Sequence, residues 1–114
     1  MGKNLVVEIP GETVELIYFQ GCPSVPLARE RLSQAFAWLG MTPNWHEWDR
    51  NAPDAPRHTR AYGSPTILVN GKDVTGMEPS CDDVGSCRVY VGEDGMIDGA
   101  PSVAIIAAAL RGGG

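Results

Sequence analysis

Apolar runs and helical repeats alternate along this chain and predict alternating strands and helices. Residues 13–19 form a nearly continuous apolar run, which is typical of a central strand covered on both faces. Residues 24–39 follow with helical spacing, with Pro26 in the first turn and Gly40 as a C-terminal cap. The apolar positions expected on the buried face of this helix are Ala28, Leu32, Ala35, Phe36 and Leu39.

The second half of the chain continues the alternation with shorter elements. Residues 44–48 predict a strand nearer the sheet edge, and residues 57–62 predict a short helix after a polar loop. Pro65 opens a strand over 64–69, and Asn70-Gly71 is a hairpin turn that returns the chain over 72–75. Residues 88–91 and 96–97 flank a turn and predict a small hairpin. Residues 101–111 predict a last helix, with Ser102 as its N-cap.

The length of 114 residues predicts one domain with one modest core. Within it, residues 1–12 hold an extra edge strand or a loosely attached arm over 4–9, and residues 112–114 are expected to be a frayed tail. The net charge of −5 argues against a nucleic-acid-binding surface, which needs clustered Lys and Arg. We therefore expect no nucleic-acid partner.

Membrane association is also not expected, because no apolar stretch approaches the roughly 20 residues that a bilayer span needs. Residues 1–12 lack the length and cleavage site of a secretory signal, so we expect a cytoplasmic protein. In that compartment a disulfide framework is disfavoured, and the three cysteines favour redox or metal chemistry.

Cys22 stands between the first strand and the first helix, flanked by Gly21 and Pro23. The first N–H groups of a helix lack internal partners and carry about half a positive charge. A sulfur placed there is stabilised as thiolate, which is the reactive form of cysteine. The alternative is that Cys22 is a small buried apolar side chain, as most single cysteines are.

With Cys22 at the first junction and Ser64-Pro65-Thr66 opening the third confident strand, the chain resembles the thioredoxin superfamily. The segment 64–76 is especially similar to the glutaredoxin motif, and the resemblance covers roughly residues 13–76 and the last helix. It implies an α/β thioredoxin-like fold, with a central mixed four-stranded sheet flanked by helices and a small extra hairpin before the last helix. It also implies a cis peptide bond before Pro65, beside the reactive sulfur, a feature realistic only before proline.

The same resemblance implies a substrate-binding site made by Ser64, Pro65, Thr66 and Pro23, with Ser64 offering backbone groups to an extended substrate. The signatures around Cys22 and Pro65 are also similar to a smaller set of thioredoxin-like proteins described as alkylmercury lyase-like, some of which carry selenocysteine at the reactive position. One departure matters: the fourth position of the family's Cys-x-x-Cys motif is Val25. A dithiol cycle within this motif is therefore excluded.

A second thiol would have to come from elsewhere in the chain. Cys87 is the preferred resolving residue, Cys81 is the other candidate, and an external thiol such as glutathione is a third route. Three other arrangements stay open. In the first, Cys81 and Cys87 pair with each other; in the second, the three thiols hold Cu(I), Zn or Hg(II); in the third, both later cysteines are inert.

The predicted function is thiol–disulfide exchange, with Cys22 as the attacking thiolate, resolved by Cys87, by Cys81 or by an external thiol. Its partners would be a protein or a low-molecular-weight thiol or disulfide, and no cofactor is expected. The alternatives are a soft-metal or mercurial-handling protein and an interaction module without chemistry. His46 and His58 are interpreted as surface residues. The three tryptophans, Trp38, Trp45 and Trp48, are expected to be core or half-buried packing.

Overall fold

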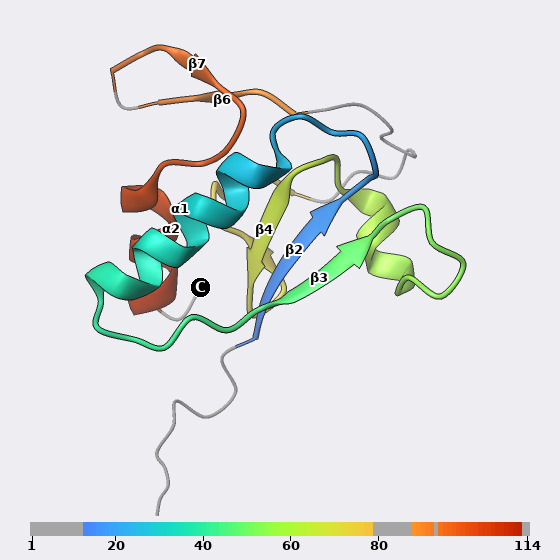
Figure 1. Ribbon diagram of the computed structural model, residues 1–114, viewed down its shortest axis with the longest axis horizontal. Helices are drawn as coiled ribbons and strands as arrows, with labels where there is room; N and C mark the ends of the chain where they lie inside the picture. The colour runs from blue at the N-terminus through green and yellow to red at the C-terminus, as the bar shows by residue number, and fades with distance from the viewer. Residues whose placement is uncertain (1–12, 79–87, 93, 113–114) are drawn as a thin grey trace, which may run out of the picture.

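A computed structural model describes residues 13–78, 88–92 and 94–112. A four-stranded mixed sheet has the order β3-β2-β4-β5, and β6 and β7 form a separate two-stranded sheet (Figure 1). The sheet strands are β2 (Val14–Tyr18), β3 (His46–Asp49), β4 (Thr66–Val69) and β5 (Lys72–Asp73). The expected strand over 4–9 lies outside the described residues.

Strand β2 is central, as its apolar run predicts. It pairs in parallel with β3 on one side and antiparallel with β4 on the other. β3 lies at the sheet edge, as its alternating residues predict. The hairpin between β4 and β5 is also confirmed, because Asn70 and Gly71 both have positive φ, at 53° and 82°. β5 is shorter than expected, ending at Asp73, whose side chain accepts hydrogen bonds from the backbone and hydroxyl of Thr75.

Helix α1 (Val25–Trp38) begins and ends within one residue of the predicted range, 24–39. Pro26 is accommodated in the first turn, where its missing N–H costs nothing. At the other end Gly40 has φ of 71° and donates to Ala37, while Met41 donates to Phe36, which is the double hydrogen bond of a glycine-capped helix end. The glycine is needed there because side chains rarely adopt this conformation.

Helix α2 (Val103–Gly112) packs beside α1 on one face of the sheet (Figure 1). Ser102 caps it, as expected, because its hydroxyl accepts from the Ile105 backbone. The helix starts two residues later than predicted and includes Gly112, one residue beyond its expected end. Before it, β6 (Tyr90–Val91) and β7 (Ile97–Asp98) form the predicted small hairpin.

Alternation along the strands divides the core between the two sheet faces. One face, under α1 and α2, holds the larger cluster; the other is covered by the short 3-10 helix η1 (Arg57–Ala61) and Trp48. The larger cluster contains Val14, Leu16, Cys22, Val25, Ala28, Leu32, Ala35, Phe36, Ile67, Val69, Ala100, Ile106, Ala107 and Leu110. The prediction that all three tryptophans pack inward is wrong for Trp38, which is 65% exposed at the end of α1.

Candidate functional site

The sheet register brings the cysteine loop and the Pro65 loop to one end of the sheet. Ile17 of β2 lies opposite Thr66 of β4, and the two strands run antiparallel. The residues that follow β2 therefore lie beside those that precede β4. The pairing that the hydrophobic pattern sets thus brings together two motifs more than 40 residues apart in the chain.

Cys22 lies in a tight turn between β2 and α1. Its backbone N–H donates to the Phe19 carbonyl at 3.3 Å, and Gly21 has φ of 86°, so the turn requires a glycine there. The helix begins three residues after Cys22, at Val25. The Cys22 side chain is part of the larger core cluster and the residue is 6% exposed, so access to its sulfur is narrow.

The Pro65 loop forms the other side of the site. The Ser64–Pro65 peptide bond is cis, as expected, and Ser64, Pro65 and Thr66 are all fully buried. The Ser64 hydroxyl accepts a hydrogen bond from the Phe19 backbone at 3.3 Å. Phe19 therefore bonds to Ser64 through its N–H and to Cys22 through its carbonyl, and it joins the two loops directly.

Arg88 is a residue of this site that the sequence analysis missed. Its backbone N–H donates to the Ser64 carbonyl at 2.6 Å. Its guanidinium donates to the Thr66 hydroxyl at 2.9 Å and to the Asp73 carboxylate at 2.6 Å. The two charged side chains are only 10% and 0% exposed, so this is a buried ion pair. The sequence gives little sign of this ion pair. Arg88 lies 15 residues from Asp73, and the basic residue next to Asp73 in the chain is Lys72.

Tyr90 completes the cluster. Its phenol donates a hydrogen bond to the Pro65 carbonyl, and the Arg88 guanidinium lies 4.6 Å from the centre of its ring. Burial raises the pKa of Tyr90 far above its usual value; the Arg88 guanidinium offsets part of this rise, and the Asp73 carboxylate adds to it. Tyr90 is therefore a neutral hydrogen-bond donor to the Pro65 loop.

The structure thus brings together four of the residues that the sequence analysis assigned to the site: Cys22, Ser64, Pro65 and Thr66. Pro23 is exposed beside Cys22. The Thr66 hydroxyl is already engaged, donating to the Gly63 carbonyl at 2.7 Å while accepting from Arg88. The two other proposed site residues, Cys81 and Cys87, lie outside the described residues.

No group of three or more His, Cys, Asp or Glu side chains gathers into a metal-binding arrangement within the described ranges. Two of the three thiols considered for a soft metal, Cys81 and Cys87, fall outside those ranges. Neither histidine contributes to the Cys22 site. His46 is exposed and stacks on Trp48, and His58 contacts the Glu15 carboxylate at 3.0 Å on the opposite sheet face.

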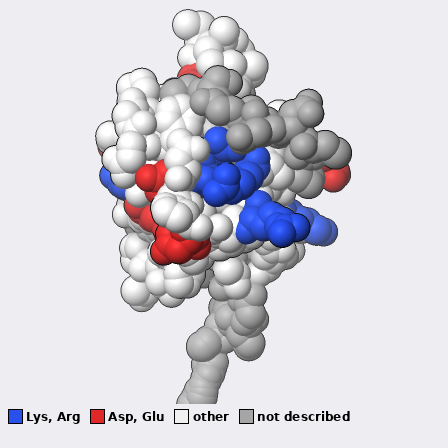
Figure 2. Space-filling model, turned by 90° about the vertical axis from the view of Figure 1, so that its right-hand side faces the viewer, with Lys and Arg blue, Asp and Glu red and all other residues white. Residues whose placement is uncertain are grey.

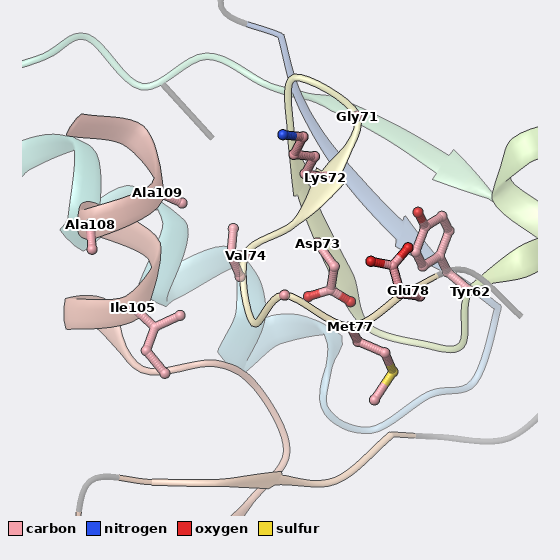
Figure 3. Close-up of a pocket in the computed structure, with 11 residues that line it drawn as sticks. Tyr62, Gly71, Lys72, Asp73, Val74, Met77, Glu78, Ile105, Ala108 and Ala109 are labelled. Atoms are coloured by element: carbon pink, nitrogen blue, oxygen red, sulfur yellow. The ribbon is translucent and has the colours of Figure 1, made fainter. Parts of the chain in front are cut away.

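A hollow in the surface is lined by residues other than Cys22. It has a volume of about 620 Å³ and opens between β5 and α2, where Lys72 and Val74 face Ile105, Ala108 and Ala109 (Figure 3). Burial raises the pKa of Tyr62, another lining residue, and the carboxylates of Asp73 and Glu78 raise it further. Because none of the described residues that line the hollow carries a thiol, we do not assign the cysteine chemistry to it.

Figure 2 shows the side of the molecule on which η1 lies, and there Lys and Arg side chains adjoin Asp and Glu side chains. Helix η1 itself contains Arg57 and Arg60. None of the helices in the described part of the chain is long and apolar enough to cross a membrane. Comparisons with family models, with curated proteins and with solved structures find no match.

Proposed function

We propose that this protein is a thioredoxin-like thiol–disulfide oxidoreductase with Cys22 as its nucleophile. The strand order β3-β2-β4-β5 supports this class, as does the pairing of β2 in parallel with β3 and antiparallel with β4. So does the distribution of helices, with α1 and α2 on one sheet face and η1 on the other. These features agree with the fold that the sequence resemblance implies.

The observation that carries the proposal is the junction at Phe19. It ties Cys22, at the start of α1, to Ser64 and the cis-Pro65 loop. A thiol used only for packing would not need a second, polar loop fixed beside it. The neutral Tyr90 phenol donates to the Pro65 carbonyl of that loop, and the positive end of α1 favours the thiolate.

The reaction would proceed in two exchange steps. The Cys22 thiolate attacks one sulfur of a disulfide, forms a mixed disulfide with it and releases the other sulfur as a thiolate. A second thiolate then attacks the Cys22 sulfur and releases the first half of the substrate. The substrate disulfide gains two electrons and becomes two thiols, while Cys22 and the resolving thiol are oxidised to a disulfide.

Cys87 is the resolving thiol that we propose, with Cys81 or an external thiol such as glutathione as the alternatives. Cys87 is joined by a peptide bond to Arg88, which is fixed to Ser64, Thr66 and Asp73. A compartment that keeps thiols reduced, such as the cytoplasm, suits this chemistry.

Three serine variants test the proposal by the products they form with oxidised glutathione. The wild-type chain should lose two thiols to one internal disulfide, whereas Cys87→Ser should stop at a glutathione adduct on Cys22. Cys81→Ser should behave as wild type, and Cys22→Ser should be unreactive at the other sites on the same timescale. Peptide mapping by mass spectrometry reads each product.

Two results would contradict the proposal. Equal loss of thiols in Cys22→Ser and wild type would remove Cys22 as the nucleophile. Retention of all three thiols, together with tight binding of Hg(II) or Zn(II) that protects them from alkylation, would favour the soft-metal function instead.

A further inference from the structure

The segment from Arg88 to Val91 is fixed at its first residue to the sheet. Arg88 makes a backbone hydrogen bond to Ser64 and side-chain bonds to Thr66 and Asp73. Asp73 is itself held in place, because its carboxylate accepts from both the backbone and the hydroxyl of Thr75. The anchor is therefore a buried, multiply bonded group rather than a surface contact.

The hairpin that continues this segment is fixed at its other end to α1. Arg31 of α1 pairs with Asp98 at 2.7 Å and donates to the Ala100 carbonyl at 2.9 Å. Gly99 packs so closely on the start of α1 that a Cβ there would lie 2.2 Å from the Ser24 hydroxyl oxygen. The hairpin thus lies over the N-terminal end of α1 (Figure 1).

Between these two anchors the chain turns Tyr90 inward. Tyr90 is buried against Pro65, whereas its neighbours Val89 and Val91 are 70% and 68% exposed. Across the hairpin, Tyr90 pairs with Asp98. Segment 88–91 is therefore a wall whose inner side is Tyr90. It bonds to Ser64 and Pro65, in the loop that Phe19 joins to Cys22, and Cys22 is itself only 6% exposed.

We infer that Arg88, anchored by Asp73, is a specificity-determining residue: it holds this wall beside Cys22 and restricts the thiol to narrow disulfides, excluding disulfides on the surfaces of folded proteins. The inference rests on the proposed thiol chemistry of Cys22. Exchange requires the attacked sulfur to reach the thiolate, so its rate depends on access. A protein disulfide brings two bulky chains to the site, and the wall must open to admit them.

The test uses the full chain with Cys81→Ser and Cys87→Ser, so that Cys22 is its single thiol. Two probes carry the same leaving group, thionitrobenzoate. The narrow probe is its mixed disulfide with 2-mercaptoethanol, and the protein probe is its mixed disulfide with a small folded protein that has one surface cysteine. Release of thionitrobenzoate reports attack by Cys22 on either probe. A synthetic peptide covering residues 18–26 supplies the ratio of the two rates without a wall.

For the chain with Cys22 as its single thiol, we expect the ratio of the narrow-probe rate to the protein-probe rate to be roughly tenfold or more above the ratio for the peptide. Asp73→Asn, which weakens the anchor, should lower this ratio toward the peptide's value by speeding only the protein probe. Glu47→Gln removes an exposed ion pair elsewhere and should leave the ratio unchanged. If Asp73→Asn does not fold, Asp98→Asn loosens the opposite end of the hairpin and should lower the ratio by a smaller factor.

Failure of this inference and failure of the proposed thiol chemistry give different results. A ratio equal to the peptide's overturns the wall while leaving the thiol chemistry intact, and so does an unchanged ratio in a folded Asp73→Asn. No reaction with the narrow probe overturns the proposed function, and the inference with it.

Discussion

At the scale of single residues, the pair of Arg29 and Glu47 links α1 to the edge strand β3. Two parallel hydrogen bonds join them, at 2.9 and 2.8 Å, and the Trp45 indole also donates to the Glu47 carboxylate. The Arg29 hydrogen bond lowers the pKa of Glu47, with the Trp45 bond acting in the same direction. The two side chains are 45% and 30% exposed, so water and salt weaken the attraction.

Glu47→Gln should therefore destabilise the protein by about 0.5 kcal/mol at pH 7. Because the pKa of Glu47 is lower in the folded state, its contribution is fully present above the ordinary value of 4.5 and is lost as the pH falls through the folded value. Urea unfolding of both proteins from pH 7 down to pH 3 measures this. A difference in stability that grows on acidification would contradict the assignment.

The buried pair of Arg88 and Asp73 differs from this exposed pair in kind. Removing one partner leaves the other charge buried, which typically costs about 3–5 kcal/mol. Asp73→Ala should therefore cost several kcal/mol, whereas Lys72→Ala, at the exposed neighbouring position, should change stability by less than about 0.5 kcal/mol. Equal costs in chemical denaturation would mean that the pair contributes nothing.

At the scale of elements, the packing of the β6–β7 hairpin on α1 depends on one glycine. Gly99 has no room for a side chain, because an added Cβ would meet both the hydroxyl oxygen of Ser24 and its Cβ, the latter at 2.8 Å. Ser24 is the N-cap position of α1, so displacing it disturbs the turn that holds Cys22.

Gly99→Ala should destabilise the protein by about 1–3 kcal/mol through overpacking. Gly112→Ala is the matched control, since nothing lies within 4 Å of its added Cβ, and alanine favours the helix in which it lies. Thermal unfolding of the two variants compares them. A neutral Gly99→Ala would mean that the hairpin is not packed on α1 as described.

The elements that local patterns specify are predictable from the sequence. The apolar run of β2, the helical spacing of α1 and the Asn70-Gly71 turn each depend on neighbouring residues, and all three predictions are confirmed. The prediction for Trp38 is wrong because a helical pattern does not tell how far a neighbouring element extends over its last turn. The early end of β5 depends on Asp73, whose partners are Thr75 and a residue 15 positions away.

At the scale of the whole molecule, the candidate site is where distant parts of the chain meet. Three of its residues are predictable because they adjoin strongly patterned elements: Cys22 lies between β2 and α1, and Ser64 and Pro65 directly precede β4. Arg88 and Tyr90 are not, because long-range hydrogen bonds fix them and no repeat in the sequence marks such bonds. The buried polar cluster beside the thiol is therefore the principal addition that the structure makes.

We propose that Cys22 is a reactive thiol in the folded protein, although it is only 6% exposed. The most direct measurement mixes the chain carrying Cys81→Ser and Cys87→Ser with a narrow aromatic disulfide in native buffer and follows release of the aromatic thiol. We expect one equivalent to be released per folded chain, with the circular dichroism spectrum unchanged throughout. Release only after addition of denaturant would contradict it, because Cys22 would then be a packing residue.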